Sequence, residues 1–300
     1  MIIKIGVAGH KPVEIPQIPF HTLVCAGADK NFNSNWDKLG FKYEKDNDGE
    51  NISKKNSSYC ELTVLYWIWK HWDADYIGLS HYRRYFNFST NANRNPRISC
   101  INIDNSSFNK YAWDEQSIIN CVSGYDVILQ RKERADSPTC KTIDVSVTNN
   151  MNNPDFILKS IADYSPEYEA DAIEFFSQNE MHWCNMMIMK KEYFNSYCEW
   201  MFGLLDYCET QARALGMNEF RLYGYISEYL LNIWVIHQEK EKHIRVKSLQ
   251  TVFWTNADKT HSFKQLSKLY VKQAFNIVFP YSSPIREKIK WMYLRKKFAK

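Results

Sequence analysis

The sequence lacks the features that mark several common classes of protein. Its 300 residues include only ten glycines and no G-x-x-x-x-G-K-[ST] loop, which argues against a P-loop phosphotransferase. Its eight cysteines form no C-x-x-C pair and lack the clustered spacing of zinc ligands. We therefore interpret the cysteines as reduced, buried thiols without a role in catalysis.

Long hydrophobic runs are also missing. No stretch reaches the roughly 18 apolar residues that a membrane-spanning helix needs. The first segment, MIIKIGVAGHK, lacks the long apolar region and the small-residue cleavage site of a signal peptide. With 45 % hydrophobic and 24 % charged residues, the composition is that of a globular protein, and we expect it to be cytoplasmic.

Positive charge and aromatic residues are concentrated. Residues 264–300 hold ten Lys or Arg and one Glu, a net charge of +9, whereas the other 263 residues carry −5. Trp291 and Phe298 lie among these cations, which predicts a peripheral anchor on the anionic inner face of the membrane. The alternative is a solvated helix packed on the main domain. Nucleic-acid binding is disfavoured, because the charge is confined to one end and no reader motif is present.

The hydrophobic pattern predicts alternating strands and helices. Strands are expected at 2–8, 20–26, 75–81, 125–130 and 182–189, and helices at 59–71, 112–122, within 154–178, from 190 to about 208, and at 218–237 with a break near Gly224. Alternation favours an α/β fold with a mostly parallel sheet flanked by helices. Such sheets bind ligands at the carboxyl ends of strands, here Gly9–Lys11, Ser80–Arg84, Gln130–Arg134 and Met189–Lys191.

The densest polar motif is Ser80-His-Tyr-Arg-Arg-Tyr-Phe86 at the end of a predicted strand. Arg83 and Arg84 are suited to phosphate because guanidinium groups bind it bidentately and keep their charge. His81 and Tyr82 add donors and a stacking face. The alternative is that the arginines are solvated or pair with Asp73 and Asp75.

Two further motifs place polar groups beside apolar elements. Asn56 and Glu61 lie near the start of the helix predicted at 59–71, which indicates either an anion site or ordinary capping. His182 and Asn185 interrupt a strand made otherwise of Met and Ile. Buried, they must find hydrogen-bond partners, so they form either a structural pair or part of a site.

Glu228 lies in an apolar helix, where burying a carboxylate is costly unless the group is paired or functional. Tyr225 and Asn232 share roughly its face, and Arg221 precedes Tyr225 by one turn. A carboxyl group in this setting has a raised pKa and suits base catalysis. A structural Glu–Arg bridge is the alternative.

These blocks together resemble a known family. C-E-L-T-x-L-Y-W-x-W-K, D-Y-I-G-L-x-H-Y-R-R-Y-F, H-x-x-N-M-x-I-M-K-K, Y-C-E-W-M-F and G-x-I-S-E-x-L-L-N occur in order within residues 2–236. They are similar to a bacterial family catalogued as a domain of unknown function, found in capsule and O-antigen loci and regarded as glycosyltransferases. The chain departs from the family pattern in the loop at 134–142 and at Tyr229, where the family often has Arg.

The resemblance implies a GT-A-like, Rossmann-type domain at residues 1–260, followed by the basic helical tail at 261–300. It implies transfer of a sugar from a nucleotide sugar of the UDP-sugar type to an oligosaccharide or polyprenyl-linked acceptor. Such enzymes commonly hold the diphosphate through a metal on an Asp-x-Asp motif. Here Asp73-Ala-Asp75 precedes its strand and Asp46-Asn-Asp48 lies in a polar loop, so a divalent metal is possible but not favoured.

Site residues follow from the motifs and the resemblance together. The catalytic base is predicted to be Glu228, with Asp144 in reserve. Donor binding is predicted for His10, Lys11, Asn56, Glu61, His81, Tyr82, Arg83 and Arg84, and acceptor binding for His182, Asn185, Arg221 and Tyr225. The alternative function is a non-catalytic nucleotide- or carbohydrate-binding assembly protein with the same fold.

Overall fold

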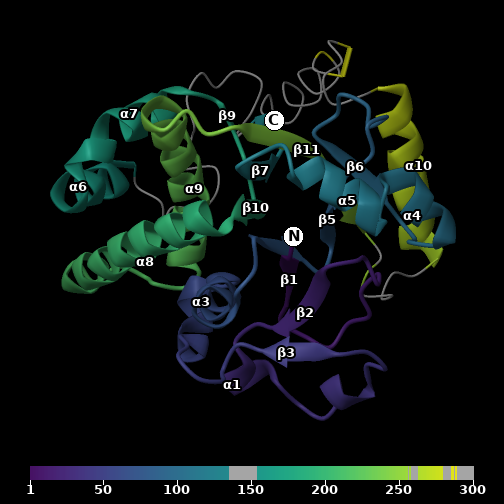
Figure 1. Cartoon of the computed structure of the whole chain (residues 1–300), viewed down its shortest axis with the longest axis horizontal. Coiled ribbons are helices and arrows are strands. Elements are labelled where there is room, and N and C mark those ends of the chain that lie inside the picture. The colour runs from purple at the N-terminus through teal and green to yellow at the C-terminus, as the bar shows by residue number, and fades with distance from the viewer. Residues whose placement is uncertain (135–153, 256, 258–262, 280–284, 287, 289–300) are drawn as a thin grey trace, which may run out of the picture.

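A computed structural model describes residues 1–134, 154–255, 257, 263–279, 285, 286 and 288 (Figure 1). The strands are β1 (Ile3–Gly9), β2 (His21–Cys25), β3 (Tyr43–Lys45), β4 (Tyr76–His81), β5 (Arg84–Asn87), β6 (Arg97–Cys100), β7 (Val127–Gln130), β8 (Glu133–Arg134), β9 (Glu180–Met181), β10 (Met187–Lys190) and β11 (Val246–Trp254). The α-helices are α1 (Ala28–Asn31), α2 (Asn56–Tyr59), α3 (Leu62–His71), α4 (Asn105–Tyr111), α5 (Glu115–Val122), α6 (Pro154–Tyr164), α7 (Glu169–Ser177), α8 (Lys191–Ala214), α9 (Leu222–Glu241) and α10 (Phe263–Val278). Short 3-10 helices occur at Trp36–Lys38, Ser53–Lys55 and Pro166–Tyr168.

The main sheet closes on itself, so the predicted GT-A-like, Rossmann-type parallel sheet is wrong. β4, β5, β11, β7 and β10 form a ring of five strands, because β10 pairs with both β7 and β4. Within the ring only β7 and β11 are parallel, and the other four pairings are antiparallel. Outside the ring, β1 pairs in parallel with both β4 and β2, β2 pairs in parallel with β3, and β6 pairs in parallel with β11. The sequence pattern predicts neither β5 nor β11, so two of the five ring strands are missed.

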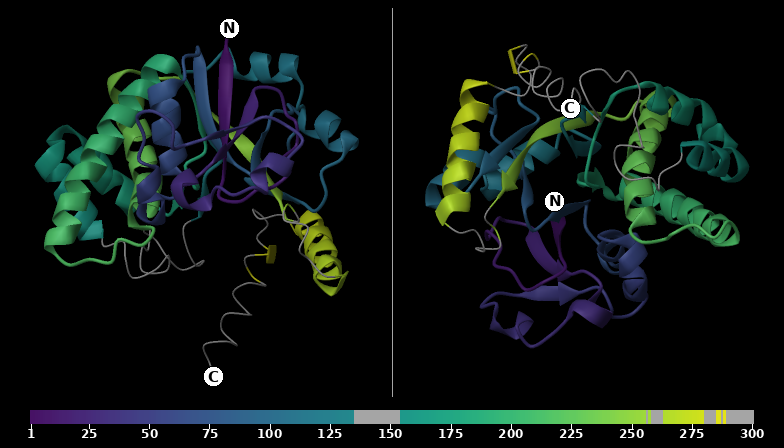
Figure 2. Two further views of the ribbon diagram at one scale, coloured as in Figure 1. Left: turned by 90° about the horizontal axis from the view of Figure 1, so that it is seen from below. Right: turned by 180° about the vertical axis from the view of Figure 1, so that it is seen from behind.

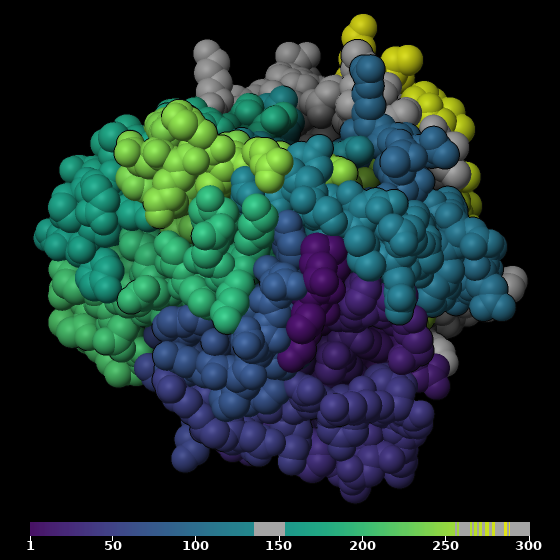
Figure 3. Space-filling model, viewed as in Figure 1, coloured from purple at the N-terminus to yellow at the C-terminus, as the bar shows by residue number. Residues whose placement is uncertain are grey.

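Strand β10 runs opposite to β4, so its carboxyl end lies at the other edge of the sheet from the one predicted. Met189 lies opposite Ile77 and Lys190 opposite Tyr76, so the carboxyl end of β10 meets the amino end of β4. The interpretation of Met189–Lys191 as part of the ligand edge is therefore wrong. Instead the turn that precedes β10 lies at the edge where β1 and β4 end. Figure 3 shows the side of the molecule opposite to this edge, where the purple start of the chain reaches the surface.

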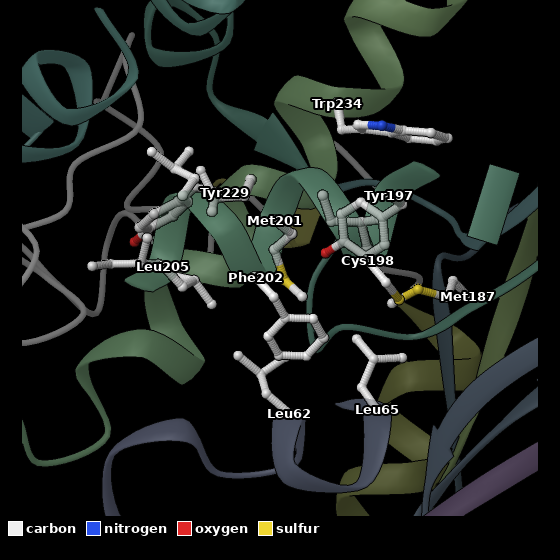
Figure 4. Packing of buried hydrophobic residues seen from close by; sticks show 14 of the residues in the cluster. Leu62, Leu65, Met187, Tyr197, Cys198, Met201, Phe202, Leu205, Tyr229 and Trp234 are labelled. Atoms are coloured by element: carbon white, nitrogen blue, oxygen red, sulfur yellow. The ribbon is translucent and has the colours of Figure 1, made fainter. Parts of the chain in front are cut away.

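Helices α3, α6, α7, α8 and α9 lie on one side of the strands, and α4, α5 and α10 lie on the other (Figures 1 and 2). The two sides correspond to two hydrophobic clusters. In the first, Leu62 and Leu65 of α3 point toward Phe202 and Met201 of α8, and α9 adds Trp234 (Figure 4). This packing fixes the start of α3 and the start of α9 against the end of β4.

Both helix starts differ from the prediction. The first helix begins at Leu62, not at residue 59, because Cys60 has a φ of 52° and interrupts the chain between α2 and α3. The last predicted helix is continuous from Leu222 to Glu241, so a break near Gly224 is wrong. Gly224 has a packing role, since a Cβ there would lie 3.0 Å from the Cβ and Sγ of Cys60.

The predicted tail is described only in part. Helix α10 exposes Tyr270, Val271 and Val278, and the side chain of Asn102 donates a hydrogen bond to the Tyr270 hydroxyl at 3.3 Å. Trp291 and Phe298 lie outside the described residues. Across the described residues, no helix combines the length and the apolar character needed to cross a membrane.

Candidate functional site

A polar cluster lies where β4 ends, between the starts of α3 and α9. His81 is the last residue of β4, and Ala8 near the end of β1 is its register partner. Glu61 immediately precedes α3, and Glu228 lies near the start of α9. The turn before β10 adds Asn185. The cluster therefore joins four segments that are far apart in the sequence.

Strained backbone surrounds this cluster. Cys60, Cys184, Asn185 and Arg221 have positive φ values of 52°, 68°, 47° and 59°. Residues other than glycine rarely adopt this conformation, and it persists only where the surrounding structure holds it. Four such residues at the edges of one cluster indicate that its geometry is tightly imposed.

Asn185 connects three of these segments. Its Nδ2 donates to Glu61 Oε1 at 2.7 Å and lies 2.9 Å from Ser227 Oγ and 3.3 Å from the Gly224 carbonyl oxygen. Ser227 Oγ in turn donates to the Gly224 carbonyl at 2.8 Å. Asn185 is fully buried, and these bonds satisfy its Nδ2 and orient the Glu61 carboxylate, whereas its Oδ1 has no hydrogen-bond partner among the described residues.

Glu228 has a pKa raised from 4.5 to about 7. Burial is the main cause, and the negative charge of Glu61 adds to it. A hydrogen bond from the Cys184 backbone and the positive charges of Arg84 and Arg221 lower the pKa and only partly offset these effects. A carboxyl group with this pKa is partly ionised at neutral pH and can accept a proton there.

His81 faces the same turn. Its Nε2 donates to the Cys184 carbonyl oxygen at 2.6 Å. Burial lowers the pKa of His81, which the charges of Arg84 and Arg83 lower further, while Glu61 and the hydrogen bond raise it. The ring is therefore a neutral donor at physiological pH, and it holds the strained turn against the end of β4.

Basic groups gather around the Tyr82 ring. The Arg83 guanidinium carbon lies 5.0 Å from the ring centroid, the Lys11 ammonium 5.8 Å, and the His10 ring contacts it edge-on at 5.6 Å. Four predicted donor-binding residues thus lie together beyond the ends of β1 and β4.

Arg84 points elsewhere. Its guanidinium carbon lies 5.4 Å from the centroid of the Phe253 ring, on β11. The alternative pairing with Asp73 and Asp75 is not seen for these arginines, because Asp73 pairs with Lys191 at 2.6 Å and Asp75 with the N-terminal amine at 3.8 Å.

The first residue of the Asp46-Asn-Asp48 motif has a structural role. Asp46 is fully buried and accepts bonds from the backbone N–H groups of Gly27 and Ala28 at 2.7 and 2.8 Å and from Ser53 Oγ at 2.6 Å. Asn56 lies beside this loop and donates to the Cys60 carbonyl at 2.7 Å, within the turn that leads to α3. Within the described part of the chain, no three His, Cys, Asp or Glu side chains are grouped to hold a metal ion.

Of the other predicted residues, Arg221 borders the Glu61–Glu228 cluster, whereas His182 lies outside it. His182 bonds through Nδ1 to the Gln130 carbonyl, and its backbone exchanges bonds of 2.9 and 2.8 Å with the Asn232 side chain. Burial lowers the pKa of His182 to about 4, as expected for a neutral structural histidine. Arg221 is exposed and stacks on Tyr225 at 5.2 Å. Asp144 lies outside the described residues.

The comparisons place the chain in a family. A family model described as a domain of unknown function, DUF4422, matches residues 4–240. The chain belongs to the DUF4422 family. The expected resemblance to a family of unknown function is thereby confirmed. A search of curated protein sequences found no match.

This DUF4422 chain is also similar to a solved structure described as the apo form of the bifunctional glycosyltransferase WbbM. The TM-score is 0.71 and the sequence identity is 29 % over 85 % of the chain. The match covers 46 % of WbbM, so the DUF4422 chain spans about half the length of that protein.

Two residues of the Glu61–Glu228 cluster are not predicted from the sequence. Cys184 supplies the carbonyl that His81 binds, and Ser227 supplies a hydroxyl to Asn185. Ser227 adjoins Glu228 in the I-S-E motif, which was a usable signal. The contribution of Cys184 comes from its backbone, which side-chain patterns do not report.

Proposed function

We propose that this chain is a glycosyltransferase that moves a sugar from a nucleotide-sugar donor, a UDP-sugar, to an oligosaccharide or polyprenyl-linked acceptor in the synthesis of a surface polysaccharide. The observation that carries the proposal is Glu228, a carboxyl group with a pKa of about 7 in a strained polar cluster at a strand end. The similarity to the bifunctional glycosyltransferase WbbM supports the reaction class.

The residues divide into two roles in this proposal. Arg83, with Lys11, His10 and Tyr82, binds the donor diphosphate, and its charge stabilises the leaving nucleotide. Glu228 accepts the proton of the attacking acceptor hydroxyl, as inverting transfer requires. Because arginine can supply the positive charge on the leaving group, we propose transfer without a divalent metal.

We assign catalysis to residues 1–260 and attachment at the inner face of the cell membrane to the basic tail at 261–300. The charge of the tail, +9 over residues 264–300, supports this division. A membrane position brings the enzyme to an acceptor that is carried on a lipid.

Nucleotide release tests the function directly. The full chain is incubated with a panel of nucleotide sugars and candidate acceptors, and the freed nucleotide is measured by chromatography. We expect release with at least one donor and a large loss in Glu228→Gln, while Glu199→Gln, an exposed change on α8, keeps wild-type turnover. Donor binding without release in any combination would support the non-catalytic assembly protein instead.

A further inference from the structure

A separate pocket of about 280 Å³ opens next to the Glu228 cluster. Its walls come from strands β5, β6, β7, β8 and β11 and from the turn before β10. The lining side chains are those of Arg84, Arg97, Gln130, Glu133, Arg134, Trp183 and Thr251. Cys184 also lines it, and the carbonyl of this residue binds His81, so the pocket and the cluster share a wall.

The lining offers both donors and acceptors of hydrogen bonds. Arg97 pairs with Glu133 at 3.4 Å, and Thr251 Oγ1 donates to Gln130 Oε1 at 3.2 Å. Burial raises the pKa of Glu133. Trp183 Nε1 donates to the Glu133 carbonyl at 3.2 Å, and the Trp183 carbonyl accepts a bond from Gln130 Nε2. These bonds hold the indole of Trp183 in the pocket wall.

Arg84 lies between the pocket and the cluster. It lines the pocket, and its charge lowers the pKa of both Glu228 and Glu133. Its Nε–H is buried, and no acceptor is present for it among the described residues. Leaving a buried donor on a charged group unsatisfied is costly, so a bound ligand that accepts this bond is favoured.

The chemistry of the lining fits a sugar. Sugar hydroxyls both donate and accept hydrogen bonds, which matches a mixed set of Arg, Gln, Glu and Thr. Sugar rings also pack their C–H faces on aromatic side chains such as Trp183. The volume lies just below the roughly 300–1,000 Å³ of pockets that enclose drug-sized ligands, which suits one sugar ring better than a whole nucleotide sugar.

We infer that this pocket binds the terminal sugar ring of the acceptor and presents one of its hydroxyl groups to Glu228. The inference rests on the proposed function and names the acceptor side of the same site. Of the lining residues, Arg84 was a predicted donor-binding residue, and Gln130, Glu133 and Arg134 belong to the strand end Gln130–Arg134 that the sequence predicts as a ligand edge. The residues predicted from the sequence to bind the acceptor contribute less directly, since His182 is held by Gln130 and Asn232 and Arg221 is exposed.

Binding of simple sugars tests the inference. Saturation-transfer NMR is recorded on the full chain with methyl glycosides of glucose, galactose, mannose, N-acetylglucosamine and glucuronic acid. The variants are Arg97→Gln and Glu133→Gln. The matched control is Arg94→Gln, an exposed change three residues before Arg97 and outside the lining. UDP affinity is measured on all four proteins by calorimetry, and circular dichroism verifies folding.

We expect at least one glycoside to bind the wild type and Arg94→Gln, and to bind Arg97→Gln and Glu133→Gln about tenfold more weakly or worse. UDP affinity should stay within about twofold in every variant, since the donor phosphates bind elsewhere. Glycoside binding that is absent from the wild type, or unchanged in both folded variants, would overturn the inference.

Failure of the proposed function has a different signature. If no nucleotide sugar is turned over but a glycoside still depends on Arg97 and Glu133, the pocket is a sugar site on a protein that is not a transferase. If nucleotide is released and acceptor KM is the same in wild type and both pocket variants, the transferase stands and the acceptor pocket is wrong.

Discussion

Replacing Glu228 by Gln should lower activity and raise stability, and the gain in stability should depend on pH. The side chains have nearly the same shape, and the Gln carbonyl can still accept the bond from the Cys184 backbone. Gln cannot accept a proton, so turnover should fall by about 10²–10⁴-fold. Wild-type turnover should rise with pH through a midpoint near 7, as the carboxyl group ionises.

The effect on stability follows from the same pKa. The folded protein holds the Glu228 proton up to about pH 7, whereas an unfolded chain releases it near 4.5. Between these values the folded state binds more protons, so wild-type stability from this group is lost as pH rises. Raising the pKa from 4.5 to about 7 corresponds to roughly 3 kcal/mol. Gln avoids this loss because it carries no charge at any pH.

Urea unfolding of wild type and Glu228→Gln at pH 5 and pH 8.5, with nucleotide release measured in parallel, checks both parts. The two proteins should differ little in unfolding free energy at pH 5, and the variant should be more stable by up to roughly 3 kcal/mol at pH 8.5. An equal difference at both pH values would refute the assignment of a raised pKa. Near-normal turnover of the variant would eliminate Glu228 as the base, as would a retaining mechanism.

Three further predictions concern the donor, metal and membrane. Arg83→Ala should weaken UDP binding by roughly 1.5–3 kcal/mol in calorimetry, whereas Arg84→Ala should leave UDP affinity nearly unchanged because Arg84 lines the other pocket. Unchanged UDP affinity in folded Arg83→Ala would remove Arg83 from the donor site. Turnover should persist in the presence of a chelator. If the chelator abolishes turnover and manganese or magnesium restores it, a metal is required. The full chain should float with anionic liposomes at physiological salt whereas a version ending near Phe263 should not, and equal binding would exclude the tail as the anchor.

Strand β11, which carries several polar residues and belongs to the five-strand ring, shows why the predicted fold is wrong. Its sequence, VKSLQTVFW, mixes polar and apolar residues without the alternation of a half-buried strand. Gln250 and Thr251 are nonetheless buried, because Asn87 donates to Gln250 at 2.9 Å and Thr251 donates to Gln130. These partners are more than a hundred residues away along the chain. A strand whose burial depends on distant polar partners has no local hydrophobic signal.

Local patterns did identify elements whose stability comes from one apolar face or a buried run. β1, β4 and α8 all formed close to their predicted ranges for this reason. The candidate base was also visible, because a carboxylate in an apolar helix stands out whatever it contacts. Its partners were not, since Glu61 and Asn185 approach Glu228 only after α3 and the turn before β10 pack together.

By itself, the sequence determined the residue types at the site, the run of buried strands and helices, and the family to which the chain belongs. The tertiary structure decided the direction of β10 and the closure of the five-strand ring. Closure brings Cys184 to His81 and opens the pocket beside Arg84. It also sets the pKa of Glu228, because burial and the charge of Glu61 act only over the short distances that folding creates.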